Sequence, residues 1–223
     1  MNGIILAAGL GKRLGKLTEK TPKPLLPIGG VPIIKLIIDK LKSGGIDEIG
    51  INLYYKADLI KNFLKDIIGL KLVVEKYLSG TGGALMNFKD FITDDFLIHN
   101  CDVISDIDLK MLIKKHKKNK PLATIALVKN YKTDRVRIFQ NRIYRFYKKR
   151  CENCYTYTGI AVLAKRIFKY FPEDKRVFSL AEVYNNAIES GEFLCGIVLN
   201  DSWYDIGTPD VYHFLLSQKI NFV

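Results

Sequence analysis

In the first half of the chain, short apolar runs alternate with stretches of helical periodicity, and this order constrains the fold more than any other feature. The pattern predicts strands over residues 4–8, 49–53, 70–74 and 96–100, with helices over residues 32–42, 57–67 and 83–91 between them. Strands and helices that alternate in this way are typical of βαβ units around a mostly parallel sheet. We therefore expect an open α/β sheet flanked by helices.

The second half of the chain is richer in strands. The pattern predicts strands over residues 122–128, 136–139, 143–146, 157–163 and 193–199, and helices over residues 165–170, 180–189 and from Pro209 onward. A Gln140-Asn141 turn joins two of these strands, which predicts a hairpin insertion. Because no repeat or low-complexity linker divides the chain, we expect one domain over residues 1–223, with halves at 1–120 and 121–223.

The composition is that of an ordinary globular protein, since the 223 residues are 48% hydrophobic and 26% charged. Charged side chains interrupt each apolar stretch well before the roughly 20 residues that a membrane-spanning helix needs, so we expect no membrane contact. The chain begins Met1-Asn2-Gly3 and enters an apolar strand without the basic segment of a secretory signal. We expect a cytoplasmic protein.

The four cysteines are scattered along the chain, at Cys101, Cys151, Cys154 and Cys195. They lack the paired spacing of a secreted disulfide framework, and a reducing compartment fits them. The Cys151 and Cys154 pair has the spacing of two zinc ligands, but a structural zinc needs four ligands and no second close pair exists. We expect no metal at these cysteines.

The net charge of +12 indicates anionic partners. The densest basic runs, over residues 114–118 and 148–150, fall at the end of a predicted helix and after the predicted hairpin. No aromatic platform for a single strand accompanies them, so we interpret both runs as solvated surface and expect no nucleic acid partner. Nucleotides and phosphosugars are anions that fit the charge equally well.

A glycine loop follows the first predicted strand, with the sequence Leu6-Ala7-Ala8-Gly9-Leu10-Gly11-Lys12-Arg13-Leu14. Open α/β sheets bind ligands at the carboxyl ends of their strands, where glycines let backbone N–H groups approach phosphate oxygens. A dinucleotide fingerprint would need glycine at Leu14, and a P-loop would need glycine at Leu10 and Ser or Thr at Leu17. Alone, the loop fits either a phosphate site of another kind or a tight turn with surface basic residues.

Three further residues have side chains suited to phosphate chemistry. Lys23 stands between Pro22 and Pro24, so its backbone is stiff and loses less entropy when the lysine grips a phosphate. Asp102 follows a predicted buried strand, and Asp205 lies in a tight corner before the last predicted helix. Magnesium in proteins takes one or two carboxylates together with waters and substrate phosphates. We expect Asp102 and Asp205 to supply that pair.

The sequence resembles the sugar-phosphate nucleotidylyltransferase family, which includes glucose-, mannose- and N-acetylmuramate-1-phosphate nucleotidylyltransferases. The similarity spans almost the whole chain. Besides the glycine loop, the motifs that carry it are Pro22-Lys23-Pro24-Leu25, Gly80-Thr81-Gly82-Gly83-Ala84-Leu85, Asn100-Cys101-Asp102, Thr158-Gly159-Ile160 and Trp203-Tyr204-Asp205-Ile206-Gly207-Thr208-Pro209. The resemblance implies a single Rossmann-like (GT-A-like) α/β domain of open mixed sheet flanked by helices, with a small β-rich sugar-binding lobe. Its first half would bind the nucleotide and its second half the sugar phosphate.

The resemblance also implies roles for individual residues. Arg13 and Lys23 would be the catalytic cations, and Asp102 and Asp205 would hold Mg²⁺. The implied nucleotide-binding residues are Leu6, Ala7, Ala8, Gly9, Gly11, Lys12, Arg13, Lys23, Glu75, Gly80, Thr81, Gly82, Gly83 and Asp102. The implied acceptor-binding residues are Asn100, Thr158, Gly159 and Glu182. We add Lys132 and Arg135 as candidates for the sugar phosphate, because that side of the site needs basic residues.

The implied substrates are a nucleoside triphosphate and a sugar 1-phosphate, joined with release of pyrophosphate by a monomer or homodimer. The sequence does not identify the sugar or the base. It also departs from the family pattern: the second half lacks a Glu-Lys-Pro tripeptide, and Cys101 stands where glycine is common. We expect no C-terminal left-handed β-helix of the kind that longer members carry.

Three alternatives remain open. A cytidylyltransferase acting on phosphocholine or another non-sugar phosphate would share the glycine loop and the lysine element. A glycosyltransferase would use an Asp-x-Asp metal motif such as Asp106-Ile107-Asp108, although we interpret this segment as a helix N-terminus. A basic protein that binds nucleic acid without catalysis would show steeply salt-dependent binding.

Overall fold

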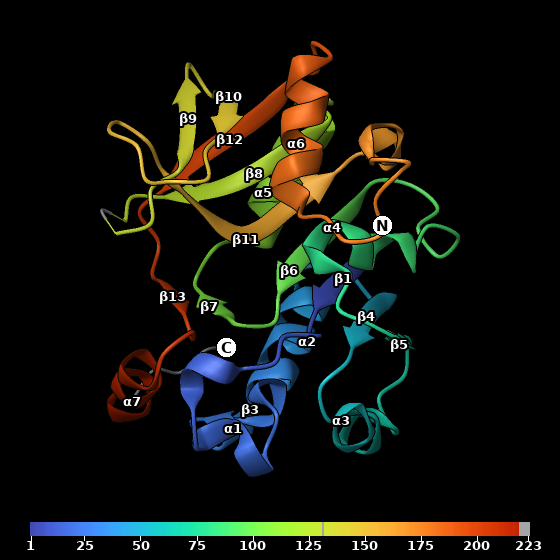
Figure 1. Cartoon of the computed structure of the whole chain (residues 1–223), viewed down its shortest axis with the longest axis vertical. Helices are drawn as coiled ribbons and strands as arrows, with labels where there is room; N and C mark the ends of the chain where they lie inside the picture. The colour runs from blue at the N-terminus through green and yellow to red at the C-terminus, as the bar shows by residue number, and fades with distance from the viewer. Residues whose placement is uncertain (131, 219–223) are drawn as a thin grey trace.

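The computed structural model describes residues 1–130 and 132–218, and its centre is a mixed sheet of nine strands in the order β5-β4-β1-β6-β11-β8-β12-β10-β9 (Figure 1). The strands are β1 (Asn2–Leu6), β4 (Ile49–Leu53), β5 (Leu70–Val74), β6 (Phe96–Asn100), β8 (Ala123–Val128), β9 (Val136–Phe139), β10 (Arg142–Phe146), β11 (Thr156–Leu163) and β12 (Leu194–Leu199). Strands from the first half are parallel to one another, and β11 joins them antiparallel to β6.

Helices and short strands complete the fold. The helices are α1 (Leu17–Lys20), α2 (Ile33–Ser43), α3 (Ala57–Leu64), α4 (Gly80–Met86), α5 (Leu109–Asn119), α6 (Leu180–Glu189) and α7 (Pro209–Ser217), with 3-10 turns η1 (Lys12–Leu14), η2 (Lys23–Leu25) and η3 (Lys165–Tyr170). The short strands pair as β2 (Pro27–Ile28) with β3 (Val31–Pro32), and β7 (Val103–Ser105) with β13 (Trp203–Asp205). No helix in these described residues is long and apolar enough to cross a membrane.

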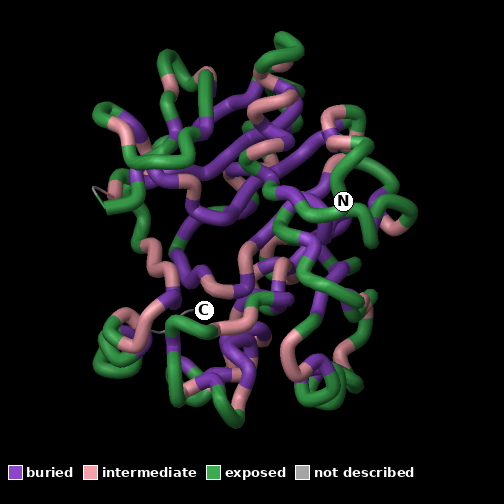
Figure 2. Tube along the Cα trace, in the orientation of Figure 1, coloured by how far each residue is buried: buried purple, intermediate pink, exposed green. Residues whose placement is uncertain are grey.

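Two hydrophobic cores lie on the two faces of the sheet. Ile5 belongs to the core that α2, α3, α5 and α7 cover, and its neighbour Ile4 belongs to the core under α4, η3 and α6. Adjacent residues of a strand point to opposite faces, which explains this division. Figure 2 shows the central strands buried and the outer helix surfaces exposed. The expected open α/β sheet flanked by helices is therefore confirmed.

Helix α4 begins earlier than the predicted range of 83–91. The prediction started the helix at Gly83, and glycine is a poor helix former, yet the helix already begins at Gly80. In the structure, the N–H groups of Gly82 and Gly83 donate to Phe178 O at 3.0 and 3.3 Å, which stabilises the first turn against the segment before α6. This tertiary contact overrides the local propensity.

The hairpin β9–β10 turns at Gln140 and Asn141, whose φ angles are 48° and 62°. Both residues adopt the left-handed conformation that a two-residue hairpin turn needs. The hairpin extends the main sheet, because Arg142 pairs with Cys195 of β12. The expected insertion is therefore the outer edge of the same sheet.

The chain returns to the first half after β12. Strand β13 pairs antiparallel with β7, so that Asp205 lies opposite Val103, and Ile206 N–H donates to Asp102 O at 2.8 Å. Tyr212 of α7 then donates its hydroxyl to Pro27 O at 2.9 Å. This crossover brings Asp205 beside the carboxyl end of β6. These contacts connect residues of the two expected halves, 1–120 and 121–223, beside the site.

Candidate functional site

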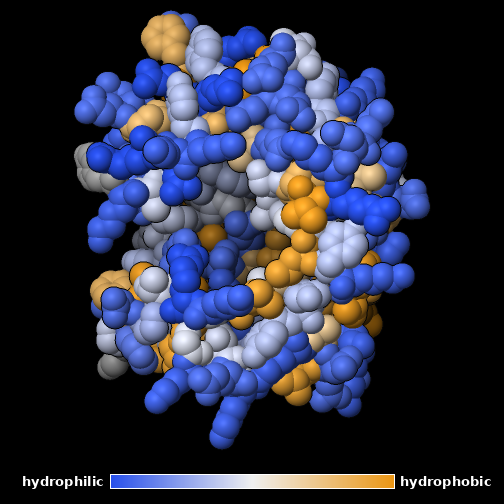
Figure 3. All heavy atoms as spheres, viewed as in Figure 1, coloured by the Kyte–Doolittle hydropathy of each residue, from blue (hydrophilic) through white to orange (hydrophobic). Residues whose placement is uncertain are grey.

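Three adjoining cavities open at the carboxyl ends of β1 and β6, and Asp102 lines all of them. We name them by position. The loop cavity, of about 330 Å³, lies along Gly9–Leu14. The α4 cavity, of about 280 Å³, lies between β1 and α4. The β11 cavity, of about 420 Å³, lies over β11. Figure 3 shows a hollow in the middle of this face of the molecule.

The glycine loop is folded onto Thr18. Gly11 has φ +66°, and a Cβ there would come within 2.9 Å of the Thr18 side chain. The Thr18 hydroxyl contacts the carbonyls of Gly11 and Gly15, each at 3.1 Å. A side chain at Gly11 would be both strained and crowded. Lys12 and Arg13, which were predicted to bind the nucleotide, line the loop cavity.

Lys23 and Asp102 form an ion pair across the site. Lys23 Nζ lies 2.8 Å from Asp102 Oδ2, and the whole lysine residue is 8% exposed. Pro22 precedes η2 and Pro24 lies within it, so the backbone around this lysine is restricted. The nearly buried ammonium group of Lys23 therefore lies beside Asp102, the residue that lines all three cavities.

Asp205 lies beside this pair with an unsatisfied oxygen. Asp205 Oδ1 is buried and has no hydrogen-bond partner within residues 1–130 and 132–218. Burial raises the pKa of this carboxyl, and the nearby charge of Asp102 raises it further, whereas Lys23 and Arg13 oppose both effects. Two carboxylates that repel each other, one with an unpartnered oxygen, are the donors that a hard divalent cation needs. The residues present fit Mg²⁺.

Arg13 lies against Gly207, the second residue after Asp205. A Cβ on Gly207 would meet the guanidinium atoms of Arg13 at 2.7 to 2.8 Å. Arg13 also lines the β11 cavity together with Asp102 and Asp205. Its position therefore depends on a glycine in the corner between β13 and α7.

The α4 cavity brings together half of the fourteen residues that were predicted to bind the nucleotide. Leu6, Ala8, Gly9, Glu75, Gly80 and Thr81 line it, and so do Asn52, Leu78, Ala84, Asn100 and Asp102. Ala7 is buried behind this wall, with its N–H directed to Asn52. Gly82 and Gly83 do not line the cavity. A Cβ at Gly82 would meet the Phe178 ring at 2.6 Å, so these glycines allow close packing of α4 instead.

The β11 cavity contains three predicted acceptor residues and Arg135. Asn100, Thr158 and Gly159 line it. Thr158 donates its hydroxyl to Ala126 O at 2.9 Å, and Gly159 has φ +84° with Asn100 atoms 2.7 to 2.9 Å from where a Cβ would stand. The hydroxyl of Thr158 thus fixes β11, while glycine at position 159 leaves room for the Asn100 side chain.

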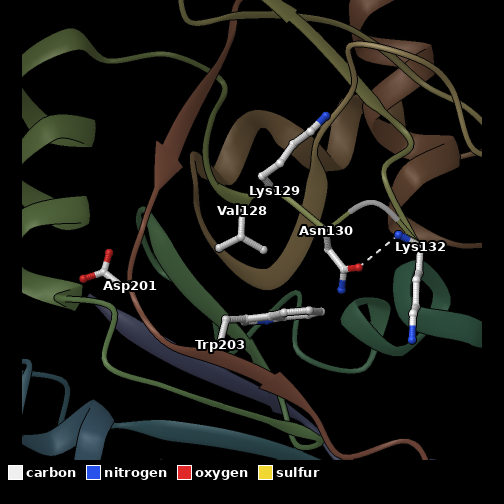
Figure 4. A pocket seen from close by; sticks show the side chains of 6 residues that line it. All are labelled: Val128, Lys129, Asn130, Lys132, Asp201 and Trp203. Carbon is white, nitrogen blue, oxygen red and sulfur yellow. Dashed lines mark hydrogen bonds between the residues drawn. The ribbon is translucent and has the colours of Figure 1, made fainter.

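Two predicted acceptor residues lie outside the β11 cavity. Glu182 forms an ion pair with Lys175 on the surface and is not among the lining residues, although its neighbour Ala181 is. Lys132 lines a separate cavity of about 360 Å³, together with Val128, Lys129, Asn130, Asp201 and Trp203 (Figure 4). Trp203 lines both this cavity and the β11 cavity, so its indole forms part of the wall of each.

Several lining residues were missed in the sequence. Aromatic side chains contribute much of the β11 cavity, at Phe146, Tyr147, Tyr157 and Trp203. Trp203 also donates Nε1–H to Thr158 O at 2.9 Å. Phe146 and Tyr157 look like ordinary core residues of strands, and Tyr147 follows β10 directly, so the sequence offered no signal for the first three. Asn52 did carry one, because a polar residue within an apolar strand that ends beside the glycine loop is unusual.

Cys151 and Cys154 are joined by a disulfide, with a Cα–Cα distance of 5.6 Å. The interpretation of four scattered cysteines in a reducing compartment did not anticipate this bond. Cys151 N–H donates to Asp134 O at 3.0 Å, and Lys129 Nζ donates to Cys154 O at 2.6 Å. The bonded loop is therefore attached to the segment that precedes Arg135. Cys101 and Cys195 are free and buried.

Comparison with known proteins identifies the family. The model of the nucleotidyl transferase family matches residues 2–219. A D-glycero-alpha-D-manno-heptose 1-phosphate guanylyltransferase from Campylobacter jejuni is 33% identical, over 97% of this chain and 100% of the relative. The bifunctional protein GlmU of Methanocaldococcus jannaschii is 32% identical over 94% of this chain, which spans only about half (52%) of that relative.

A solved structure agrees with these sequence matches. A Bacillus anthracis protein assigned as a glucose-1-phosphate thymidylyltransferase, crystallised with sucrose, superposes with a TM-score of 0.88 at 26% identity, over 100% of this chain and 97% of the other. The GT-A-like architecture is thereby confirmed. The chain belongs to the nucleotidyl transferase family, among its sugar-phosphate nucleotidyltransferases.

Proposed function

We propose that this protein transfers a nucleoside monophosphate from a nucleoside triphosphate to a sugar 1-phosphate, with Mg²⁺, and releases pyrophosphate. The observation that supports this most is the place of Asp102, which lines the loop cavity, the α4 cavity and the β11 cavity together. A residue in that position can contact a group that passes from one substrate to the other. In nucleotidyl transfer, that group is the α-phosphate.

The basic residues of the loop cavity suit the triphosphate. Arg13 and Lys23 neutralise charge on the α-phosphate oxygens and on the departing pyrophosphate, and backbone N–H groups of Gly9 to Arg13 take the remaining oxygens. Asp102 and Asp205 hold Mg²⁺, which when bound withdraws charge from phosphate oxygens. Positioning and charge neutralisation supply most of the rate enhancement in phosphoryl transfer, so no covalent enzyme intermediate is needed.

The α4 cavity takes the nucleoside and the β11 cavity takes the sugar phosphate. Arg135 and Asn100 lie along the β11 cavity, where they pair with the acceptor phosphate and a sugar hydroxyl. One acceptor oxygen forms a bond to the α-phosphorus. The bond from that phosphorus to the bridging oxygen breaks on the opposite side, and pyrophosphate leaves with the electron pair.

We propose GTP as the nucleotide and a heptose or hexose 1-phosphate as the acceptor. The support is the Campylobacter jejuni guanylyltransferase, which the chain matches along its whole length. A relative named for another base, the Synechocystis UTP–glucose-1-phosphate uridylyltransferase, matches with a lower identity of 26%. The aromatic side of the β11 cavity suits the apolar face of a sugar ring.

Pyrophosphate release tests the proposal. The protein is assayed with GTP, UTP, CTP and dTTP against mannose, glucose and heptose 1-phosphates, phosphocholine and inositol 1-phosphate, with Mg²⁺ or with EDTA. We expect a Mg²⁺-dependent signal with GTP and one sugar 1-phosphate. A signal only with CTP and phosphocholine would replace this function by the cytidylyltransferase alternative, and silence across all pairs would contradict both.

A further inference from the structure

Buried hydrogen bonds join the two walls of the α4 cavity through Asn52, near the carboxyl end of β4. Asn52 Oδ1 accepts the N–H of Ala7 at 2.8 Å, and its Nδ2 donates to Glu75 Oε1 at 2.5 Å. Glu75 Oε2 accepts the N–H and the hydroxyl of Ser79, at 3.0 and 2.8 Å. Asn52, Glu75 and Ser79 are 3%, 8% and 6% exposed.

The donors and acceptors in this network permit one arrangement. If the amide of Asn52 were turned over, its NH₂ group would face the Ala7 N–H and its oxygen would face the Glu75 carboxylate. Buried polar groups without partners are costly, so the observed orientation is fixed by chemistry as well as by space. The network therefore resists small displacements of either wall.

Each end of the network is attached to a wall of the cavity. Ala7 precedes Ala8 and Gly9, which line the side next to β1. Ser79 precedes Gly80 and Thr81, which line the side next to α4. Asn52 also lies beside Leu6 in the parallel pairing of β1 and β4. One side chain thus sets the spacing between the glycine loop and the start of α4.

We propose that Asn52 is a positioning residue for the nucleotide, acting through Ala7 and Glu75. This inference rests on the proposed function only in that the α4 cavity takes the nucleoside of a nucleoside triphosphate. Glu75 also holds Ser79 in place, because its carboxylate accepts one hydrogen bond from Asn52 and two from Ser79. Three of its four lone-pair positions are thereby occupied. Fixing both walls before binding lowers the ordering cost that the nucleotide would otherwise meet.

An exchange of the two side chains tests the network. In Asn52→Asp, two carboxylates face each other, and in Glu75→Gln an amide donor must face either Asn52 Nδ2 or the Ser79 N–H. Combining the substitutions restores every bond. The carboxylate introduced at position 52 accepts from Ala7 N–H and from the amide introduced at position 75, and the oxygen of that amide accepts from Ser79. The combined variant therefore exchanges the positions of the amide and the carboxylate while keeping the same hydrogen-bond geometry.

We expect each single substitution to weaken nucleotide binding and the combination to restore it. Dissociation constants for GTP, UTP, CTP and dTTP are measured by calorimetry with Mg²⁺, and steady-state kinetics give KM for both substrates. Each single variant should raise the nucleotide Kd and KM by about 10- to 100-fold, with the acceptor KM within about twofold of wild type. The combined variant should return to within about threefold, which is strong non-additivity.

Asn119→Asp, at the exposed end of α5, is the matched control and should leave both constants unchanged. Unchanged nucleotide Kd in both single variants, with a lowered melting temperature, would show that the network only stabilises the fold and would overturn the proposal. So would a combined variant as impaired as the sum of its parts. If Asn52→Asp is insoluble, the nucleotide Kd of the combined variant decides between the two outcomes. A value near that of wild type supports the proposal, and a strongly raised value overturns it.

The same measurements separate this inference from the proposed function. Wild-type protein that binds a nucleotide but transfers it to no acceptor would contradict the proposed function, and the binding series would still decide the part played by Asn52. Wild-type protein that binds none of the four nucleotides would overturn both.

Discussion

Lys23 and Asp102 stand 79 residues apart in the chain, yet Lys23 Nζ lies 2.8 Å from Asp102 Oδ2. The side chain of the lysine is 10% exposed and that of the aspartate 29%. Only this ammonium group makes an ion pair with Asp102 within the described part of the chain, and the Asp205 carboxylate lies close enough to interact with both charges. Under the proposed function, this arrangement would hold the ammonium charge beside the phosphate oxygens.

Replacing Lys23 with methionine should lower turnover far more than stability. We expect kcat to fall by about 10²- to 10³-fold, because a preorganised charge at the phosphates is lost. The free energy of unfolding should fall by about 1–2 kcal/mol, since solvent partly screens the remaining Asp102 charge. Pyrophosphate release and urea unfolding give the two values.

Lys35→Met is the matched control, because Lys35 pairs with Asp39 at 2.6 Å on the exposed side of α2. Its turnover should equal that of wild type. Wild-type turnover in Lys23→Met as well would remove Lys23 from the catalytic assignment.

Gly207→Ala should displace Arg13 without unfolding the corner. Gly207 has no positive φ, and the atoms that its Cβ would meet belong to the end of a flexible side chain. We expect kcat to fall by about tenfold or more while the melting temperature changes by less than about 3 °C. In an Arg13→Ala background the glycine substitution should have no further effect on turnover. Independent, multiplying effects would show that Gly207 acts by another route.

The stability of the protein should fall in mild acid through His99. This side chain is 0% exposed, and burial lowers its pKa from the ordinary 6.5 to about 4. Between these values the unfolded chain binds a proton that the folded protein does not, so stability decreases as the pH falls through this window. From pH 7 to pH 5 the loss should be about 2 kcal/mol.

His99→Leu provides the comparison, because it removes the titrating group from β6 and leaves His116 in place. Urea unfolding of the variant at the two pH values should show a loss smaller by that amount. Equal losses in the two proteins would mean that His99 does not carry the pH dependence.

Breaking the Cys151–Cys154 bond should have a modest effect on stability. The closed loop is short, since the two cysteines are three positions apart, and chain entropy then gives a stabilisation of about 2 kcal/mol. A Cys151→Ala/Cys154→Ala variant should lose that amount in urea unfolding, and dithiothreitol should lower wild-type stability equally. Denatured, unreduced protein should show two reactive thiols, from Cys101 and Cys195. Reaction of all the cysteines would show that the bond is absent in solution.

The sequence predicted most strands and helices because their periodicities are local. Strands Leu70–Val74 and Phe96–Asn100 and helix Leu180–Glu189 have the predicted bounds. Asp108 caps α5 by accepting from the N–H groups of Lys110 and Met111, as the helix N-terminus interpretation of this segment required. The place of Asp102 also follows from local reasoning, since it comes directly after a buried strand.

The local hydrophobic periodicity of the sequence does not predict contacts between segments that are distant in the chain. The neighbourhood of Asp205 and Asp102 depends on the pairing of β13 with β7, which no periodicity indicates. The sequence suggested the two aspartates as a pair through their chemistry as magnesium ligands, and the resemblance implied the same pair. The early start of α4 depends on Phe178. Lys132 was chosen for its charge alone, and Trp203 stands between its cavity and the β11 cavity. In each case the position of the residue or helix depends on tertiary contacts, which the neighbouring sequence does not determine.

The corner between β6 and β7 has an evolutionary consequence. Asn100 lines both the α4 and the β11 cavity, and Asp102 lines all three, so under the proposed function this short peptide would contact both the nucleotide and the acceptor. A substitution there alters the handling of both substrates at once. The lining residues between Glu75 and Ala84 belong only to the loop and α4 cavities, whereas those between Thr133 and Thr158 belong only to the β11 cavity. Under the proposed function, base preference and sugar preference could therefore evolve separately, because the residues that would select each one line different cavities.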